Sequence, residues 1–423
     1  MQLFHLFSML IVLSALFAYI NHRVLKLPNS IGLMMVSLVF SLTILLTGNI
    51  IPAFKSIIIK QLMQVDFSEL LLEVMLSFML FAGAIHIKYK DLKSEKLSIF
   101  LFSSVSVLIS TFLIGFSSFY ILNLFDIKIQ LIHALLFGAL ISPTDPIAVL
   151  SILKSAKISK SLETKIAGES LFNDGVAVVV FMILLEIAKS DVQIEALNVI
   201  KIFGQEAVGG ILLGIAIGWI GYKLIASIDN YQVEVLITLA VVMGGYTFAH
   251  YLHASGPLAM VVAGLITGNQ AKDYGMSKTT TEYIDKFWEL IDEILNALLF
   301  VLIGLELLVI QTDKIIVLIS VVLIIVGLMT RYISVLIPSL LIRLKEKIDQ
   351  KTLFILTWGG LRGGISIALA LSIPEHFNKD IWVTITFVIV CFSILVQGLT
   401  IGKFTKLIQK NNDISSKQKV KNE

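Results

Sequence analysis

Two carboxylates lie five residues apart in an otherwise apolar stretch of the chain. Glu169 and Asp174 belong to the segment Gly-Glu-Ser-Leu-Phe-Asn-Asp-Gly at residues 168–175, which continues into an apolar run. At the centre of a membrane helix, one carboxylate costs about 2.5–3.5 kcal/mol on insertion scales. The pair, with Ser170 and Asn173 between them, therefore indicates a site that binds something positive: a metal ion, a proton or a basic side chain.

Helical periodicity divides these side chains between two faces. Ser170 and Asp174 are four residues apart and share one face, while Glu169 and Asn173 share a neighbouring face. A small hard cation prefers oxygen ligands, and a carboxylate in a medium of low dielectric takes up a proton readily. We therefore expect Asp174 to be both cation ligand and proton carrier, so that competition at one carboxylate produces antiport. The alternative is that Asp174 serves only to pair with an arginine.

The composition places this helix in a membrane protein. Hydrophobic residues make up 57% of the chain and the mean hydropathy is +0.91, whereas soluble domains contain roughly 45–50% apolar residues. We therefore expect an all-α polytopic membrane protein of about thirteen transmembrane helices, each near the ~20 residues that a bilayer requires. The expected spans are residues 3–20, 31–47, 67–86, 97–124, 130–153, 164–187, 199–226, 233–251, 256–270, 288–310, 314–341, 352–373 and 381–402.

The basic residues indicate the orientation of these spans. Most of the 33 lysines and arginines lie in the loops that follow odd-numbered spans and in the C-terminal tail. By the positive-inside rule, the N-terminus is outside and the C-terminus is cytoplasmic, in a cell membrane. The net charge of +3 is then an orientation signal, and it gives no reason to expect a nucleic acid partner.

The fifth span is interrupted by the sequence Ser-Pro-Thr-Asp-Pro at residues 142–146. Each proline removes a backbone donor and disfavours helix in the residue before it. The helix should therefore unwind near Thr144, and Asp145 would cap a second half-helix that begins at Pro146. A simple proline kink is the alternative, although a single proline would suffice for that.

The twelfth span is interrupted by Gly-Gly-Leu-Arg-Gly-Gly at residues 359–364. The chain enters the fifth and twelfth spans from opposite sides of the membrane, because they are seven spans apart. Corresponding interruptions in two such halves predict a transporter built from inverted repeats, with its site near the midplane. Glycine packing between helices is the alternative, but it does not explain Arg362.

These three motifs closely resemble those of the sodium/proton exchanger family, including its bacterial NhaP-type members and the animal exchangers. The resemblance extends over roughly residues 1–402. It implies two crossing discontinuous helices, a homodimer, elevator-like alternating access, and exchange of Na+ or Li+ for H+ without a cofactor. The Asn173–Asp174 pair is typical of the electroneutral branch, so we expect one proton per Na+.

The resemblance also implies roles for individual residues. Asp174, Ser170 and Thr144 would bind Na+, and Asn173 would orient the site. Asp145 is expected to offset the dipole of a half-helix, with direct ligation as the alternative. Glu73, in the third span, either lines the cytoplasmic approach to the site or is a buried structural residue.

Glu169 requires a partner, because a buried charge without a counter-ion is very costly. Arg331, in the eleventh span, is the expected partner, in line with the Glu–Arg bridge of the resembling family. Glu169 would then brace the core without carrying protons. Arg362 would compensate carbonyl groups at the helix crossing, and its pairing with Glu169 is the alternative. Glu306, near the end of the tenth span, is expected to be solvated.

The domain organisation follows from the same resemblance. We expect a transmembrane antiporter domain and a short basic cytoplasmic tail at 403–423. Within the domain, 97–187 and 314–402 would form the ion-transporting core, and 1–96 and 199–310 the dimerisation and linking helices.

The sequence leaves three functions to compare. The first is exchange of Na+ or Li+ for H+ in pH homeostasis, with lipid, monovalent cations, protons and a second copy of the chain as partners. The second is K+/H+ antiport by the same fold. The third is a cation channel or pH sensor, but the sequence shows isolated carboxylates and no filter-like repeat. An enzyme is not expected, because no nucleotide loop, metal-ligand cluster or nucleophile–base constellation appears.

Overall fold

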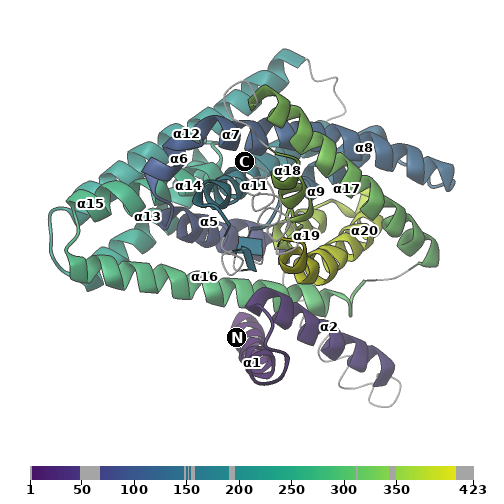
Figure 1. Cartoon of the computed structure of the whole chain (residues 1–423), viewed down its shortest axis with the longest axis horizontal. Coiled ribbons are helices and arrows are strands. Elements are labelled where there is room, and N and C mark those ends of the chain that lie inside the picture. The colour runs from purple at the N-terminus through teal and green to yellow at the C-terminus, as the bar shows by residue number, and fades with distance from the viewer. Residues whose placement is uncertain are drawn as a thin grey trace, which may run out of the picture.

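The computed structural model describes residues 2–47, 67–146, 149–150, 152–153, 158–189, 196–310, 313–342 and 349–405. These residues form helices joined by turns, which confirms the expected all-helical fold (Figure 1). Nine helices in this described part are long and apolar enough to cross a membrane. The remaining expected spans coincide with the long helix Lys278–Glu306 and with shorter helices such as Leu131–Ile141 and Gly256–Ile266, so the structure is compatible with thirteen.

Most of the first six spans are continuous helices. Several consist of consecutive helical segments. The label η marks short turns that are not α-helical: η1 to η4 and η6 are wider π turns, and η5 is a tighter 3-10 turn. The elements are α1 (Gln2–Ile20), η1 (Asn21–Leu25), α2 (Asn29–Thr47), α4 (Phe67–Glu69), η2 (Leu70–Met75), α5 (Leu76–Ile85), α6 (Tyr89–Ser94), α7 (Lys96–Phe100), η3 (Leu101–Val105), α8 (Ser106–Leu124), α9 (Leu131–Ile141) and α11 (Lys160–Lys189).

The second half of the chain contains long helices and one interrupted span. Its elements are α12 (Ala196–Ile225), α13 (Tyr231–Tyr251), α14 (Gly256–Ile266), η4 (Thr267–Ala271), α15 (Lys272–Tyr274), α16 (Lys278–Glu306), α17 (Lys314–Ile342), α18 (Gln350–Trp358), α19 (Gly364–Leu371), η5 (Glu375–Phe377), α20 (Lys379–Phe392) and η6 (Ser393–Gln397). The last helix continues to Thr405. Residues 403–405 of the expected tail are therefore helical, and the rest of the tail lies outside the described residues.

The helices pack in two groups. One group contains α8, α9, α11, α17 and α20, with α19 packed between α9 and α20; the other contains α5, α12, α13 and α14. In Figure 1, α12 to α14 lie on one side, α17 to α20 lie on the other, and α16 runs beneath both. The groups meet where α11 packs on α14, α12 and α5, and where η2 and α4 pack on α19.

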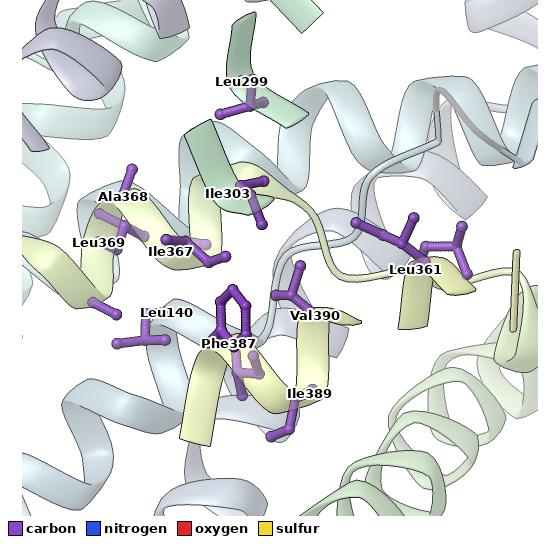
Figure 2. Close-up of a cluster of buried hydrophobic side chains, with 14 of the residues drawn as sticks. Leu140, Leu299, Ile303, Leu361, Ile367, Ala368, Leu369, Phe387, Ile389 and Val390 are labelled. Atoms are coloured by element: carbon purple, nitrogen blue, oxygen red, sulfur yellow. The ribbon is translucent and has the colours of Figure 1, made fainter. Parts of the chain in front are cut away.

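Apolar packing surrounds the two interruptions. Figure 2 shows Leu361 beside side chains from four helices, all of them buried in one large hydrophobic cluster. A separate cluster around Phe81, Val242 and Trp288 holds the second group together. A third small cluster, formed by Val179, Ile183 and Leu258, lies at the contact between α11 and α14.

Candidate ion-binding site

The two interrupted spans meet at their breaks. The backbone N–H of Asp145 donates to the carbonyl of Leu361 at 2.8 Å, which forms an isolated antiparallel bridge. This bridge gives part of the unwound backbone a partner, as membrane depth requires. A Cβ atom on Gly363 would lie 2.6 Å from the Cβ of Asp145, so glycine is what allows the two chains to approach this closely. The predicted unwinding around Thr144 is present.

Two polar side chains of α11 converge on Thr144. Ser170 Oγ donates to the Thr144 carbonyl at 2.5 Å, and Asn173 Nδ2 donates to Thr144 Oγ1 at 2.9 Å. Asn173 Oδ1 is buried and has no partner in the described part of the chain. The helix α11 therefore presents a hydroxyl and an amide to the unwound stretch. The helical spacing assigns Ser170 and Asn173 to neighbouring faces, and both side chains reach Thr144.

Asp174 has a larger exposed fraction than Ser170, Asn173 and Thr144. Ser170, Asn173 and Thr144 are at most 5% exposed, whereas Asp174 is partly exposed. Among the described residues, no lysine or arginine forms an ion pair with Asp174, so the alternative of arginine pairing finds no support. Asp145 is also partly exposed and is close enough to interact electrostatically with Asp174. Residues 147 and 148, which the Asp145 side chain would cap, lie outside the described residues.

Two buried charged side chains, Glu169 and Arg331, form a network separate from the groups around Thr144. Arg331 Nη2 lies 2.6 Å from Glu169 Oε1, and both side chains are at most 5% exposed. The same Nη2 also donates to the carbonyl of Leu356 in α18, at 3.3 Å. The ion pair that the sequence predicts between Glu169 and Arg331 is therefore present, and it links α11 to α17.

Arg362 serves the broken backbone and is not the direct partner of Glu169. Its Nη1 donates to the carbonyls of Ser142 at 2.5 Å and Pro143 at 3.0 Å. Its own backbone N–H donates to Ser393 Oγ at 2.8 Å. Pro146 has no N–H for the Ser142 carbonyl, which lies four residues before it. A guanidinium with several N–H groups can supply two acceptors at once.

Glu73 lies apart from this network. It is exposed on η2, in the group of helices opposite α11. The alternative that Glu73 is a buried structural residue is therefore wrong. The turn that carries it packs against α19, the half-helix that begins after Gly363.

Sequence reasoning missed one acidic residue near the crossing and misplaced another. Asp292, in α16, is close enough to Asp145 to interact electrostatically, and its position within an expected span was the available signal. Glu306 is only 8% exposed and lies near Lys379. The expectation that Glu306 is solvated is wrong, because the end of α16 is covered by neighbouring residues.

Comparisons with known proteins agree on one family. The family model described as "Sodium/hydrogen exchanger, transmembrane" matches residues 12–407. The chain is similar to the Na(+)/H(+) antiporter NhaP of Pseudomonas aeruginosa, with 46% identity over 94% of this chain and 95% of that protein. It is also 33% identical to the Na(+)/H(+) antiporter NhaH of Halobacillus dabanensis, over 91% of this chain and 93% of that protein.

Solved structures show the same fold. The structure of the sodium proton antiporter MjNhaP1 from Methanocaldococcus jannaschii at pH 8 superimposes with a TM-score of 0.75. The match covers 96% of this chain and 99% of that chain, at 21% sequence identity. At that identity the likeness concerns the fold alone.

Proposed function

Because the chain belongs to the sodium/hydrogen exchanger family, we propose that it exchanges Na+ or Li+ for H+ across a cell membrane at Asp174. The observation that carries this proposal is one carboxylate with polar neighbours and, among the described residues, no basic counter-ion. Asp174 is partly exposed beside a buried hydroxyl, a buried amide and an unwound backbone. Such a carboxylate can bind a cation or a proton, and the neighbouring groups supply oxygen ligands.

The Na+ site would be formed by Asp174, the hydroxyl of Ser170 and an oxygen of Thr144. Ser170 Oγ and the Thr144 carbonyl already lie 2.5 Å apart, so a cation could use both oxygens after a small separation. Asn173 fixes the Thr144 side chain through its hydrogen bond and is a positioning residue. Transport by such a site requires no cofactor.

Antiport follows from competition at Asp174. A hard cation prefers the ionised carboxylate, and a proton replaces it when no cation is bound. If the site changes sides only when it is loaded, the inward flow of one ion drives the outward flow of the other. Asn173 is neutral, so one carboxylate exchanges one Na+ for one H+, and the exchange is electroneutral.

The two groups of helices suggest how the site changes sides. We infer that residues 97–187 and 314–402 move as the ion-transporting core against residues 1–96 and 199–310, which form the dimerisation and linking helices. The packing of α12, α13 and α5 around α14 supports this division. Two copies would assemble through the second group, with the N-termini outside and the C-termini cytoplasmic. Glu73 would line the cytoplasmic approach.

The replacement Asp174→Asn tests the proposal. In proteoliposomes with an internal pH-sensitive dye, addition of Na+ or Li+ should produce proton flux in the wild type and none in the variant. Glu289→Gln is a matched control, since it also removes one carboxylate but at an exposed position of α16, and it should retain the flux.

Two outcomes would contradict the proposal in different ways. Flux that survives in Asp174→Asn would show that another group carries the proton. A wild type that responds to K+ but not to Na+ would identify a K+/H+ antiporter of the same fold. Choline in place of the metal cation measures the leak.

A further inference from the structure

The helix that carries Glu73 contains a widened turn at that residue. In η2, the N–H of Leu76 bonds to the carbonyl of Leu71, which is five residues back in place of the usual four. Single wide turns of this kind inside α-helices are frequently found at functional sites. The extra residue rotates the side chains that follow by about 100° relative to those before. The direction in which the Glu73 side chain points therefore depends on η2 keeping this wide turn.

A tyrosine from another helix supplies a donor to this turn. In a regular α-helix, the N–H of Leu76 would bond to the carbonyl of Leu72, but that donor is used by Leu71. The hydroxyl of Tyr246, in α13, donates to the Leu72 carbonyl at 2.7 Å. A carbonyl at membrane depth is costly without a donor, so this hydrogen bond favours the wide turn over the regular one.

The ring of Tyr246 is held on the opposite side by the start of α14. A Cβ atom on Gly256 would lie 2.6 Å from Tyr246 Cε2, so the ring packs directly on that glycine. Two residues further on, Leu258 packs on Gly175, where a Cβ atom would lie 2.6 Å from Leu258 Cδ2. Gly175 follows Asp174 in the chain. One continuous set of contacts thus runs from the proposed site to the turn of Glu73.

We propose that Tyr246 is a positioning residue, whose hydroxyl holds the turn of η2 so that Glu73 faces the approach to Asp174. This inference rests on the proposed function, which assigns Glu73 to the approach of ions to Asp174. The effect of Tyr246 is on the entry of Na+, and the binding of Na+ and H+ at Asp174 itself does not depend on it.

The variant Tyr246→Phe removes the hydroxyl and keeps the ring on Gly256. In Na+/H+ exchange by proteoliposomes, its apparent KM for Na+ should rise about three- to tenfold, the range that one hydrogen bond is worth. The maximal rate should stay near that of the wild type. Glu73→Gln should raise KM as well, and adding Tyr246→Phe to Glu73→Gln should have no further effect. Thr247→Val is the matched control, because the exposed Thr247 hydroxyl bonds only within its own helix, to the Met243 carbonyl at 2.8 Å.

A second readout examines the turn without transport. Tyr246→Phe should increase amide hydrogen exchange in the peptide that covers residues 70–77, and Glu73→Gln should leave that exchange unchanged. An unchanged KM in either single variant would overturn the proposal, as would a KM that rises further in the double variant. A fall in thermal stability and maximal rate with KM unchanged would reduce Tyr246 to a structural residue. Absence of Na+-driven flux in the wild type would instead contradict the proposed function.

Discussion

Glu169 and Asp174 lie on the same helix and have opposite surroundings. Glu169 is 2% exposed and lies against Arg331, whereas Asp174 is partly exposed beside groups that donate or offer oxygen. A charge that is buried with a counter-ion contributes to a fixed structure, and removing one partner leaves the other charge uncompensated. A charge that is accessible can exchange its ligand. The two acids are therefore expected to respond differently to substitution.

Replacing Glu169 by alanine should destabilise the protein by about 3–5 kcal/mol, because Arg331 would remain buried without its counter-ion. The measurement is the temperature at which the detergent-solubilised protein loses its monodisperse elution, together with the yield of folded protein. Glu282→Ala is the control, since it breaks an exposed ion pair with Lys286 and should change neither quantity. Normal stability of Glu169→Ala with abolished transport would show that Glu169 acts in transport.

At the scale of the element, the crossing of the two interrupted spans depends on replacement hydrogen-bond donors in one span and on space at glycines in the other. The prolines of the fifth span remove donors, and Arg362 supplies them again through its contacts with the carbonyls of Ser142 and Pro143. The glycines of the twelfth span provide space. The backbone of Gly363 has φ −117° and ψ −163°, which other residues also adopt, so its requirement for glycine comes from the proximity of Asp145.

Gly363→Ala should therefore separate the two broken helices. The new Cβ would lie 2.6 Å from the Cβ of Asp145, a distance at which one chain must shift. We expect a large loss of Na+-driven proton flux in proteoliposomes, with a lower unfolding temperature. The control is Gly244→Ala, because a Cβ on that helical glycine would meet nothing within 4 Å. If Gly363→Ala exchanges ions at the wild-type rate, the close approach is not needed for function.

At the scale of the whole molecule, the two groups of helices touch over limited elements. The helix α11 contacts α14, α12 and α5, and α19 contacts η2 and α4. Both α11 and α19 lie next to residues proposed to handle the ion. A relative movement of the groups would therefore change access to Asp174 directly. It would leave the ion pair of Glu169 intact, because Arg331 belongs to the same group.

The proposed one-to-one exchange predicts that transport is insensitive to membrane potential. One net charge moved across 100 mV is worth about 2.3 kcal/mol, or about 50-fold in the final ion gradients. Vesicles that hold such a potential, set by K+ and valinomycin after K+ is excluded as a substrate, should reach the same final pH gradient as vesicles without it. Vesicles with the Asp174→Asn variant measure the proton leak that does not depend on exchange. A shifted end point would show that net charge moves and that a second group carries a proton.

The sequence by itself determined the class of protein, its two interruptions and the division of α11 into faces. These properties are local: apolar segments require a bilayer, prolines lack a donor, and residues four apart share a helix face. The motifs at residues 142–146, 168–175 and 359–364 could therefore be recognised without any structure.

Only the tertiary structure decided which groups meet. Arg362 bonds to carbonyls about 220 positions away in the chain, and Tyr246 bonds to a carbonyl 174 positions away. Whether Arg331 or Arg362 pairs with Glu169, and whether Glu73 is exposed, depends on the rotation of each helix against its neighbours. Packing between distant segments sets that rotation, so the sequence of a single apolar segment does not determine it.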